Sequence, residues 1–175
     1  MNSRVKLLGH PLHPMLIVYP LGLLSTAVIF DLISMATDST IFPVVSYWMI
    51  TAGIIGGLLA AIIGFFEWMA IPVDSRAKRI SNWHALGNLT VVLLFAASWW
   101  LRTGVPNNVP TTTAFSLSLA ALLLALVTGW LGGELVYRLG VGVDHGANVN
   151  APSSLSADSA GTRTAEKHSG RTTIR

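Results

Sequence analysis

The sequence contains four apolar stretches, each long enough to cross the hydrocarbon core of a bilayer as a helix. They run over about residues 15–36, 44–71, 83–102 and 114–137. A transmembrane helix needs about 20 mostly apolar residues because each residue advances it by about 1.5 Å. The links between the stretches are short, so consecutive helices are expected to be antiparallel neighbours. The pattern predicts an all-α integral membrane fold, an up-down-up-down four-helix bundle.

Charged residues are too few for a water-soluble domain. Asp, Glu, Lys and Arg make up 11% of the 175 residues, whereas a soluble domain carries about 25%. The chain has no cysteine, which excludes a disulfide, a thiolate metal site or a cysteine-ligated iron–sulfur cluster within it. The net charge is only +3 and the basic residues are dispersed. These features argue against nucleic acid as a partner and favour the lipid bilayer.

The positions of the basic residues predict the orientation of the bundle, because cytoplasmic loops of membrane proteins are enriched in Lys and Arg. The N-terminal segment, the second link and the C-terminal tail carry basic residues. The first and third links carry none apart from Arg102, which ends the third stretch. We therefore expect a multi-pass protein of the cell inner membrane with both termini cytoplasmic. A secretory signal is the rival interpretation of the first stretch, but that stretch exceeds a typical h-region and contains Asp31.

The composition changes near residue 144. Residues 1–143 are predicted to form the transmembrane domain. Residues 144–175 are rich in small and polar residues and are predicted to be a disordered cytoplasmic tail. Pro20 is expected to kink the first helix, and Pro43 to act as a stop in the first link. The sequence shows no convincing internal repeat.

Small residues recur at every fourth position in two of the stretches. The second stretch contains Gly53 and Gly57, and also Gly56, Ala60 and Gly64 at the same spacing; the fourth contains Ala121, Ala125, Gly129 and Gly133. Small residues let helix backbones approach closely in lipid, where apolar surfaces alone give no reason to associate. We expect these two faces to make the tight contacts of the bundle or of a homodimer.

Ionisable residues inside apolar stretches need a partner or a function, because each costs about 2.5 to 3.5 kcal/mol to insert. Toward the outer side, Asp31 and Arg102 are expected to form an interhelical ion pair or to extend to the interface. Toward the cytoplasmic side, the topology gathers His10, His13, Glu67, His84 and Glu134. A helix or turn would point His10 and His13 the same way because they are three apart. Asn88 follows His84 on the same helix face.

Three histidines and two carboxylates are a suitable ligand set for zinc or non-haem iron, whereas two histidines on facing helices could hold a haem axially. Structural roles are the alternative. Glu134 could pair with Arg138, Glu67 could pair with the basic residues at 76–79, and the histidines could contact lipid headgroups. The chain has no nucleophile elbow, phosphate loop or dinucleotide fingerprint, so we do not expect an enzyme on its own.

Two segments are similar to the end motifs of a known family. Residues 9–15 read GHPLHPM, and residues 129–138 read GWLGGELVYR. In this order and spacing they resemble the opening and closing signatures of a bacterial four-helix membrane family, catalogued as domain of unknown function 2231. The resemblance covers about residues 7–143. Many members have a histidine after the closing Tyr-Arg, where this chain has Leu139, so that position is left out of the predicted site.

The family has no settled activity, and the resemblance implies little about function. Some members carry the module fused to a Rieske-type iron–sulfur domain, which implies a role beside electron transfer and a redox partner protein. In one hypothesis, His10, His13 and His84 bind a haem b or a transition-metal ion, with Glu67 and Glu134 as further metal ligands. In the other, the bundle is a non-catalytic membrane anchor or scaffold for a partner protein.

Overall fold

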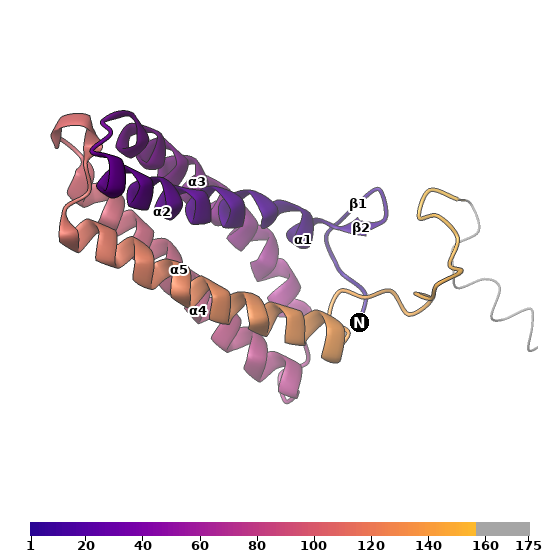
Figure 1. Ribbon diagram of the computed structural model, residues 1–175. Helices are drawn as coiled ribbons and strands as arrows, with labels where there is room; N and C mark the ends of the chain where they lie inside the picture. The colour runs from indigo at the N-terminus through magenta and orange to yellow at the C-terminus, as the bar shows by residue number, and fades with distance from the viewer. Residues whose placement is uncertain (157–175) are drawn as a thin grey trace, which may run out of the picture.

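The computed structural model describes residues 1–156, and its long helices form an antiparallel bundle (Figure 1). In chain order these are α1 and α2 (Leu12–Leu16 and Val18–Thr37), α3 (Ile41–Ala70), α4 (Arg76–Arg102) and α5 (Thr112–Gly133). Within these residues, four helical segments are long and apolar enough to cross a membrane. The predicted all-α membrane bundle is therefore confirmed.

Short elements flank and connect the long helices. The strands β1 (Lys6–Leu7) and β2 (His10–Pro11) form a hairpin before α1. A 3-10 turn, η1 (Pro106–Asn108), links α4 to α5, and a π-helical turn, η2 (Glu134–Arg138), continues α5. Residues 144–156 contain turns and no helix or strand; the rest of the predicted tail, 157–175, lies outside the described residues.

Two prolines lie near helix boundaries, Pro20 after the start of α2 and Pro43 after the start of α3. The first helix is interrupted at Ile17, between α1 and α2. Pro20 lacks an N–H, and its ring crowds the carbonyl four residues earlier, where α1 ends. The kink expected at Pro20 is thus present as a break just before it. The expectation for Pro43 is wrong: Pro43 is the third residue of α3, where no backbone N–H needs a helical partner.

Polar capping residues begin α4 and α5 earlier than the apolar pattern indicates. Ser75 accepts a hydrogen bond from the Lys78 N–H at 3.0 Å, and Thr111 accepts one from the Ala114 N–H at 3.2 Å. Residues 76–82, expected in a link, therefore form the first turns of α4. The hydropathy pattern reports the part of a helix that lies in lipid and misses polar turns outside it.

The helices pack as two hairpins. The first hairpin is α1–α3 and the second is α4–α5; each pair packs along its length, and contacts between the hairpins are fewer. We call the two ends of the bundle the η1 end and the α1 end. The apolar core, which includes Leu24, Ile50, Phe95 and Ala121, lies toward the η1 end. Toward the α1 end the hairpins diverge (Figure 1), and few side chains are buried.

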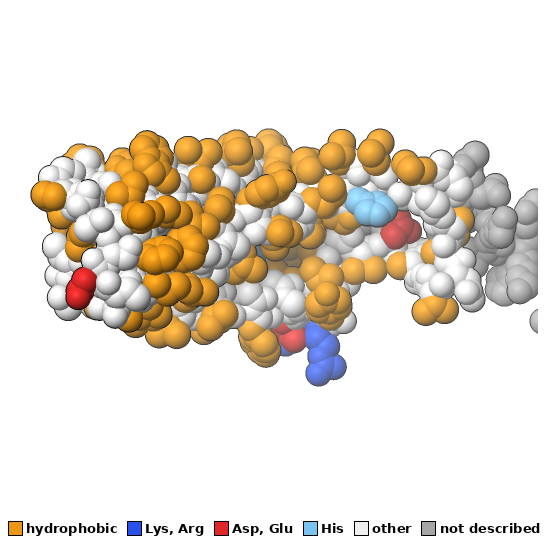
Figure 2. Space-filling view, turned by 45° about the horizontal axis from the view of Figure 1, so that its top comes forward, with side chains coloured by type: hydrophobic (Ala, Val, Ile, Leu, Met, Phe, Trp, Pro, Cys, Tyr) orange, Lys and Arg blue, Asp and Glu red, His pale blue; other side chains and the backbone are white. Residues whose placement is uncertain are grey.

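Apolar side chains cover the outside of the bundle. Large exposed residues include Leu58, Leu89, Leu123 and Trp130. Figure 2 shows apolar side chains along the helices on one face of the bundle, with few charged side chains. A helix that is apolar all round is typical of a membrane span. This surface is consistent with contact between the bundle and the lipid bilayer.

Candidate functional site

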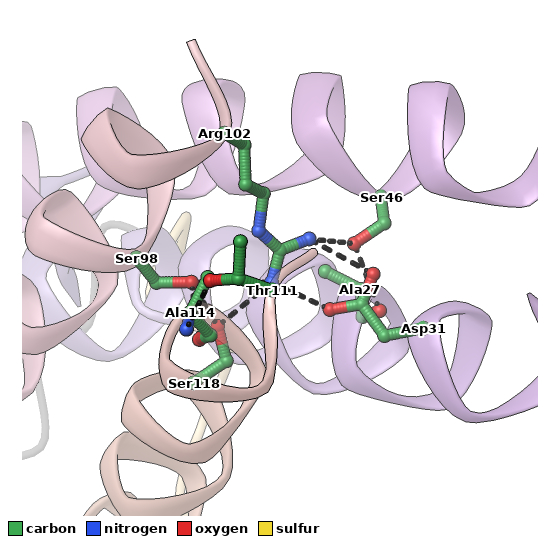
Figure 3. A network of polar contacts seen from close by, with 8 residues as sticks. All are labelled: Ala27, Asp31, Ser46, Ser98, Arg102, Thr111, Ala114 and Ser118. Atoms are coloured by element: carbon green, nitrogen blue, oxygen red, sulfur yellow. Dashed lines mark hydrogen bonds and ion pairs between the residues drawn. The ribbon is translucent and has the colours of Figure 1, made fainter. Parts of the chain in front are cut away.

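A buried ion pair joins the two hairpins at the η1 end (Figure 3). Arg102 of α4 donates from Nη1 to Asp31 Oδ1 at 2.8 Å and from Nη2 to Asp31 Oδ2 at 2.6 Å. Both side chains are 0% exposed. Of the two expectations for these residues, the interhelical ion pair is confirmed, and neither side chain extends to the interface. The two-pronged geometry is the strong form of this interaction.

Three serine hydroxyls surround the guanidinium, one each from α3, α4 and α5. Nη1 lies 3.2 Å from Ser46 Oγ, and Nη2 lies 3.1 Å from Ser98 Oγ and 3.2 Å from Ser118 Oγ. Each hydroxyl donates its own proton onward: Ser46 to the Ala27 carbonyl, Ser118 to Ser98, and Ser98 to the Ala114 carbonyl. Among the buried side-chain nitrogen and oxygen atoms of residues 1–156, only Arg102 Nε has no hydrogen-bond partner. The network engages all four spans and serves as a structural lock.

None of the three serines was predicted, although the sequence carries one signal for them. Ser98 precedes Arg102 by four residues, so the two share one face of α4. Ser46 and Ser118 lie on other helices, and their approach depends on how those helices are rotated.

His13 lies against α3 toward the α1 end. Its Nδ1 is 3.0 Å from the Ala60 carbonyl oxygen. A carbonyl only accepts, so Nδ1 carries the proton and Nε2 of the neutral ring has a free lone pair. The ring packs on Gly64, where a Cβ would stand 2.8 Å from His13 Cε1. Gly64 therefore makes the space that the imidazole fills.

His84 makes the same contacts with α5. Its Nδ1 is 2.9 Å from the Thr128 carbonyl oxygen, which places the proton on Nδ1. A Cβ on Gly132 would stand 3.1 Å from His84 Cε1. One contact has no counterpart at His13: the Asn88 amide nitrogen lies 3.2 Å from His84 Nε2, and the Thr128 hydroxyl donates to Asn88 Oδ1 at 3.1 Å.

These shared contacts show that the two hairpins are structurally equivalent. His13 and His84 are 71 residues apart, and so are Asp31 and Arg102. Their contact residues are shifted by 68 positions, which pairs Ala60 with Thr128, Gly64 with Gly132, and Ser46 with Ala114. An approximate two-fold axis along the bundle therefore relates the hairpins. Few equivalent positions hold the same residue, so the relation between the hairpins does not show as a repeat in the sequence.

The other predicted site residues have separate surroundings. His10 lies in β2 and is exposed. Glu67, near the end of α3, accepts hydrogen bonds from the Ser3 hydroxyl and from the backbone N–H groups of Arg4 at 3.2 Å and Val5 at 2.9 Å. The expected pairing of Glu67 with the basic residues at 76–79 is wrong, because the N-terminal segment folds across the end of α3 and occupies this carboxylate.

Glu134 pairs with Arg76 across the second hairpin. Arg76 Nη2 donates to Glu134 Oε1 at 2.7 Å, and the two side chains are 58% and 15% exposed. The expected pair of Glu134 with Arg138 does not form. These two residues are the ends of the π-helical turn η2. A π-helix has more residues per turn than an α-helix, so residues i and i+4 no longer lie on the same face.

The N-terminal hairpin and the segment after η2 lie together at the α1 end (Figure 1). The Ser154 hydroxyl donates to the Leu8 carbonyl at 3.1 Å, and Lys6 Nζ lies 3.6 Å from Asp144 Oδ2. The Gly146 N–H donates to the Asp144 carboxylate and lowers its pKa, and Lys6 adds to this effect. Both segments thus lie at the α1 end of the bundle.

The five predicted ligands do not form one cluster. Among residues 1–156, no group of three or more His, Asp or Glu residues is arranged to hold a metal ion. His13 lies within electrostatic range of both His84 and Glu67. The metal site drawn from all five side chains stays a prediction, and His13 and His84 are the pair that the fold presents in equivalent settings.

The small-residue face of α3 packs inside the molecule. A Cβ on Gly53 would stand 2.6 Å from Leu24 Cδ2, and one on Gly57 would stand 3.4 Å from Val92 Cγ2. This confirms the tight contacts expected within the bundle. On α5, Gly129 has no atom within 4 Å of its Cβ position. A homodimer through the α5 face stays a prediction.

Comparison with known proteins gives one match. A family model described as "Predicted membrane protein (DUF2231)" matches residues 9–145, which contain the buried ion pair and both half-buried histidines, His13 and His84. No curated protein and no solved structure matches the chain.

Proposed function

The chain belongs to the DUF2231 family of predicted membrane proteins, and we propose that it binds a haem b between its hairpins, with His13 and His84 as the axial ligands. One observation carries this proposal. Each imidazole donates Nδ1–H to a backbone carbonyl of the neighbouring helix. That hydrogen bond fixes the ring and makes Nε2 the atom that can ligate iron, the usual arrangement for a metal-binding histidine. At His84, ligation would replace the 3.2 Å contact between Nε2 and the Asn88 amide.

The position of the pair supports the same conclusion. Gly64 lies six residues before the end of α3, and His84 lies eight residues after the start of α4. Both imidazoles are therefore about 10 Å from the helix ends at the α1 end. In this half the hairpins diverge (Figure 1) and bury few side chains. An apolar macrocycle between the hairpins would complete a core that the protein itself builds only toward the η1 end.

Two axial histidines suit electron transfer, because they leave the iron no open position for a substrate. We propose a membrane subunit that exchanges electrons with a redox partner protein at the α1 end. Apart from the buried Arg102, the basic residues within residues 1–156 all lie at that end: Arg4, Lys6, Arg76, Lys78, Arg79 and Arg138. The positive-inside bias then places the α1 end, with both termini, on the cytoplasmic side of the inner membrane. C-terminal fusions to a cytoplasmic fluorescent reporter and to a periplasmic phosphatase test this orientation; activity of the phosphatase fusion would contradict it.

Absorption spectroscopy and metal analysis of the detergent-purified protein test the haem site. We expect a Soret band with one iron per chain, and low-spin signals in electron paramagnetic resonance. His13→Ala and His84→Ala should each lose the low-spin spectrum, while the matched control His10→Ala, at an exposed position, should keep it. If the protein holds stoichiometric metal but shows no Soret band, the site binds a non-haem ion instead of haem. Its ligands would then come from the five predicted His and Glu side chains.

The opposite result is equally clear. A colourless, metal-free preparation from cells supplied with iron and haem precursor would overturn the proposal. Equal spectra for His13→Ala, His84→Ala and His10→Ala would also overturn it. Either result would favour the non-catalytic anchor or scaffold, whose function rests on the bundle and its buried lock alone.

A further inference from the structure

We propose that one face at the start of α4 binds the headgroup of an anionic phospholipid. The face consists of Arg79, Asn82, Trp83 and Leu86, which line a pocket of about 240 Å³. Their spacing places all four on the same side of the helix. They lie in the first three turns, where the helix leaves the polar link and enters its apolar part. The proposal does not depend on haem binding.

The pocket offers hydrogen-bond donors that have no acceptor. Within residues 1–156, no hydrogen bond or ion pair engages the Arg79 guanidinium, the Asn82 amide nitrogen or the Trp83 indole N–H. Asn82 Oδ1 accepts from Trp68 Nε1 at 2.7 Å, which orients the amide and leaves its NH₂ group available. No carboxylate lines the pocket. Donor groups with one unpaired cation beside a mostly apolar surface suit the headgroup of an anionic lipid.

Neighbouring basic residues are already engaged, which singles out Arg79. Arg76 pairs with Glu134. Lys78 Nζ donates to the Trp68 carbonyl at 2.6 Å and lies 3.5 Å from the centre of the Trp68 ring. Arg79 is therefore the basic residue of this link whose charge is free for a ligand.

The surface beyond the pocket favours a lipid over a free phosphate ion. Leu86, Leu89 and Leu93 continue along α4 and are 55%, 54% and 58% exposed. An acyl chain can lie along these side chains while the headgroup phosphate accepts from Arg79 and Asn82. Trp83 stands between the two regions, the position that tryptophan favours at a membrane interface.

Quenching of tryptophan fluorescence by brominated lipid tests the proposal. The full-length protein is reconstituted into phosphatidylcholine nanodiscs containing brominated phosphatidylglycerol or, in parallel, brominated phosphatidylcholine. The chain has 6 Trp, so the Trp83 signal is obtained as the difference between wild type and Trp83→Phe. We expect brominated phosphatidylglycerol to quench half of this signal at a mole fraction about fivefold lower than brominated phosphatidylcholine needs. This is the effect of roughly one basic contact at a membrane surface.

Two variants decide between a site and general attraction to the surface. Arg79→Gln should abolish the preference for the anionic lipid. Arg138→Gln is the matched control, because it removes the same charge from an exposed position at the same end, and it should retain the preference. Equal quenching by both lipids in wild type, or an equal loss of preference in both variants, would overturn the proposal. Circular dichroism of each variant in detergent confirms that it is folded before reconstitution.

Discussion

Exchange of the two buried charges at the η1 end is the sharpest test of the structural equivalence of the hairpins. Asp31 and Arg102 occupy matching positions, and each is 0% exposed. Asp31→Asn leaves a buried guanidinium without its counter-charge, and loss of one member of a buried pair costs about 3–5 kcal/mol. The single substitutions Asp31→Arg and Arg102→Asp should cost at least as much, because each buries two like charges.

The double variant Asp31→Arg/Arg102→Asp should recover most of this loss. If the approximate two-fold axis holds, the two-pronged pair forms again with its partners exchanged. The hydroxyls of Ser46, Ser98 and Ser118 then no longer accept hydrogen bonds from a guanidinium, and three such hydrogen bonds in a membrane protein are worth about 2 kcal/mol together. The double variant should therefore be less stable than wild type by about 2 kcal/mol and more stable than either single exchange.

Unfolding by sodium dodecyl sulfate in mixed micelles, followed by circular dichroism, measures these differences in the free energy of unfolding. A cost below about 1 kcal/mol for Asp31→Asn would contradict the buried ion pair as a structural lock. The equivalence of the two positions would be refuted if the double variant were no more stable than the less stable of the two single variants.

Three further changes follow from individual contacts. Gly64→Ala should lower the thermal unfolding temperature in detergent, because the new Cβ would stand 2.8 Å from an imidazole carbon. Gly129→Ala has nothing within 4 Å of its Cβ and should be neutral or stabilising by up to about 1 kcal/mol. A Gly129→Ala variant less stable than Gly64→Ala would contradict this packing. Arg76→Ala removes a pair to Glu134 that is 58% exposed on the arginine side, so the free energy of unfolding should fall by less than about 1 kcal/mol, and a larger fall would be inconsistent with a surface pair. Asn88→Ala removes the amide that contacts His84 Nε2. Titration of the haem-free variant with haem should therefore show about fivefold tighter binding than wild type. Weaker binding than wild type would contradict ligation through His84.

Much of the fold could be predicted because lipid imposes local rules. A backbone in hydrocarbon must satisfy its own hydrogen bonds, so an apolar run of sufficient length is a helix wherever it occurs. The predicted spans therefore agree with the observed helices in number and order. The ends were less predictable: Ser75 and Thr111 start helices in polar sequence, where hydropathy carries no signal.

The candidate site was only partly predictable for a different reason. Topology places His13, Glu67, His84 and Glu134 at one end of the bundle, and the structure agrees. Which of them approach one another depends on helix rotation and on what the chain ends do. Glu67 is taken by the N-terminal segment and Glu134 by Arg76, contacts that no spacing along the sequence reveals.

The sequence by itself determined that this protein is a four-helix membrane bundle, because hydrophobic length is a property of each segment alone. Only the tertiary structure decided that Asp31 and Arg102 meet in a serine-lined lock, and that His13 and His84 occupy equivalent settings. Those relations join residues on different helices, and close approach at Gly64 and Gly132 sets the positions of the two imidazoles. Equivalent geometry therefore persists where few residues remain the same, since packing requires a matching shape more than a matching side chain.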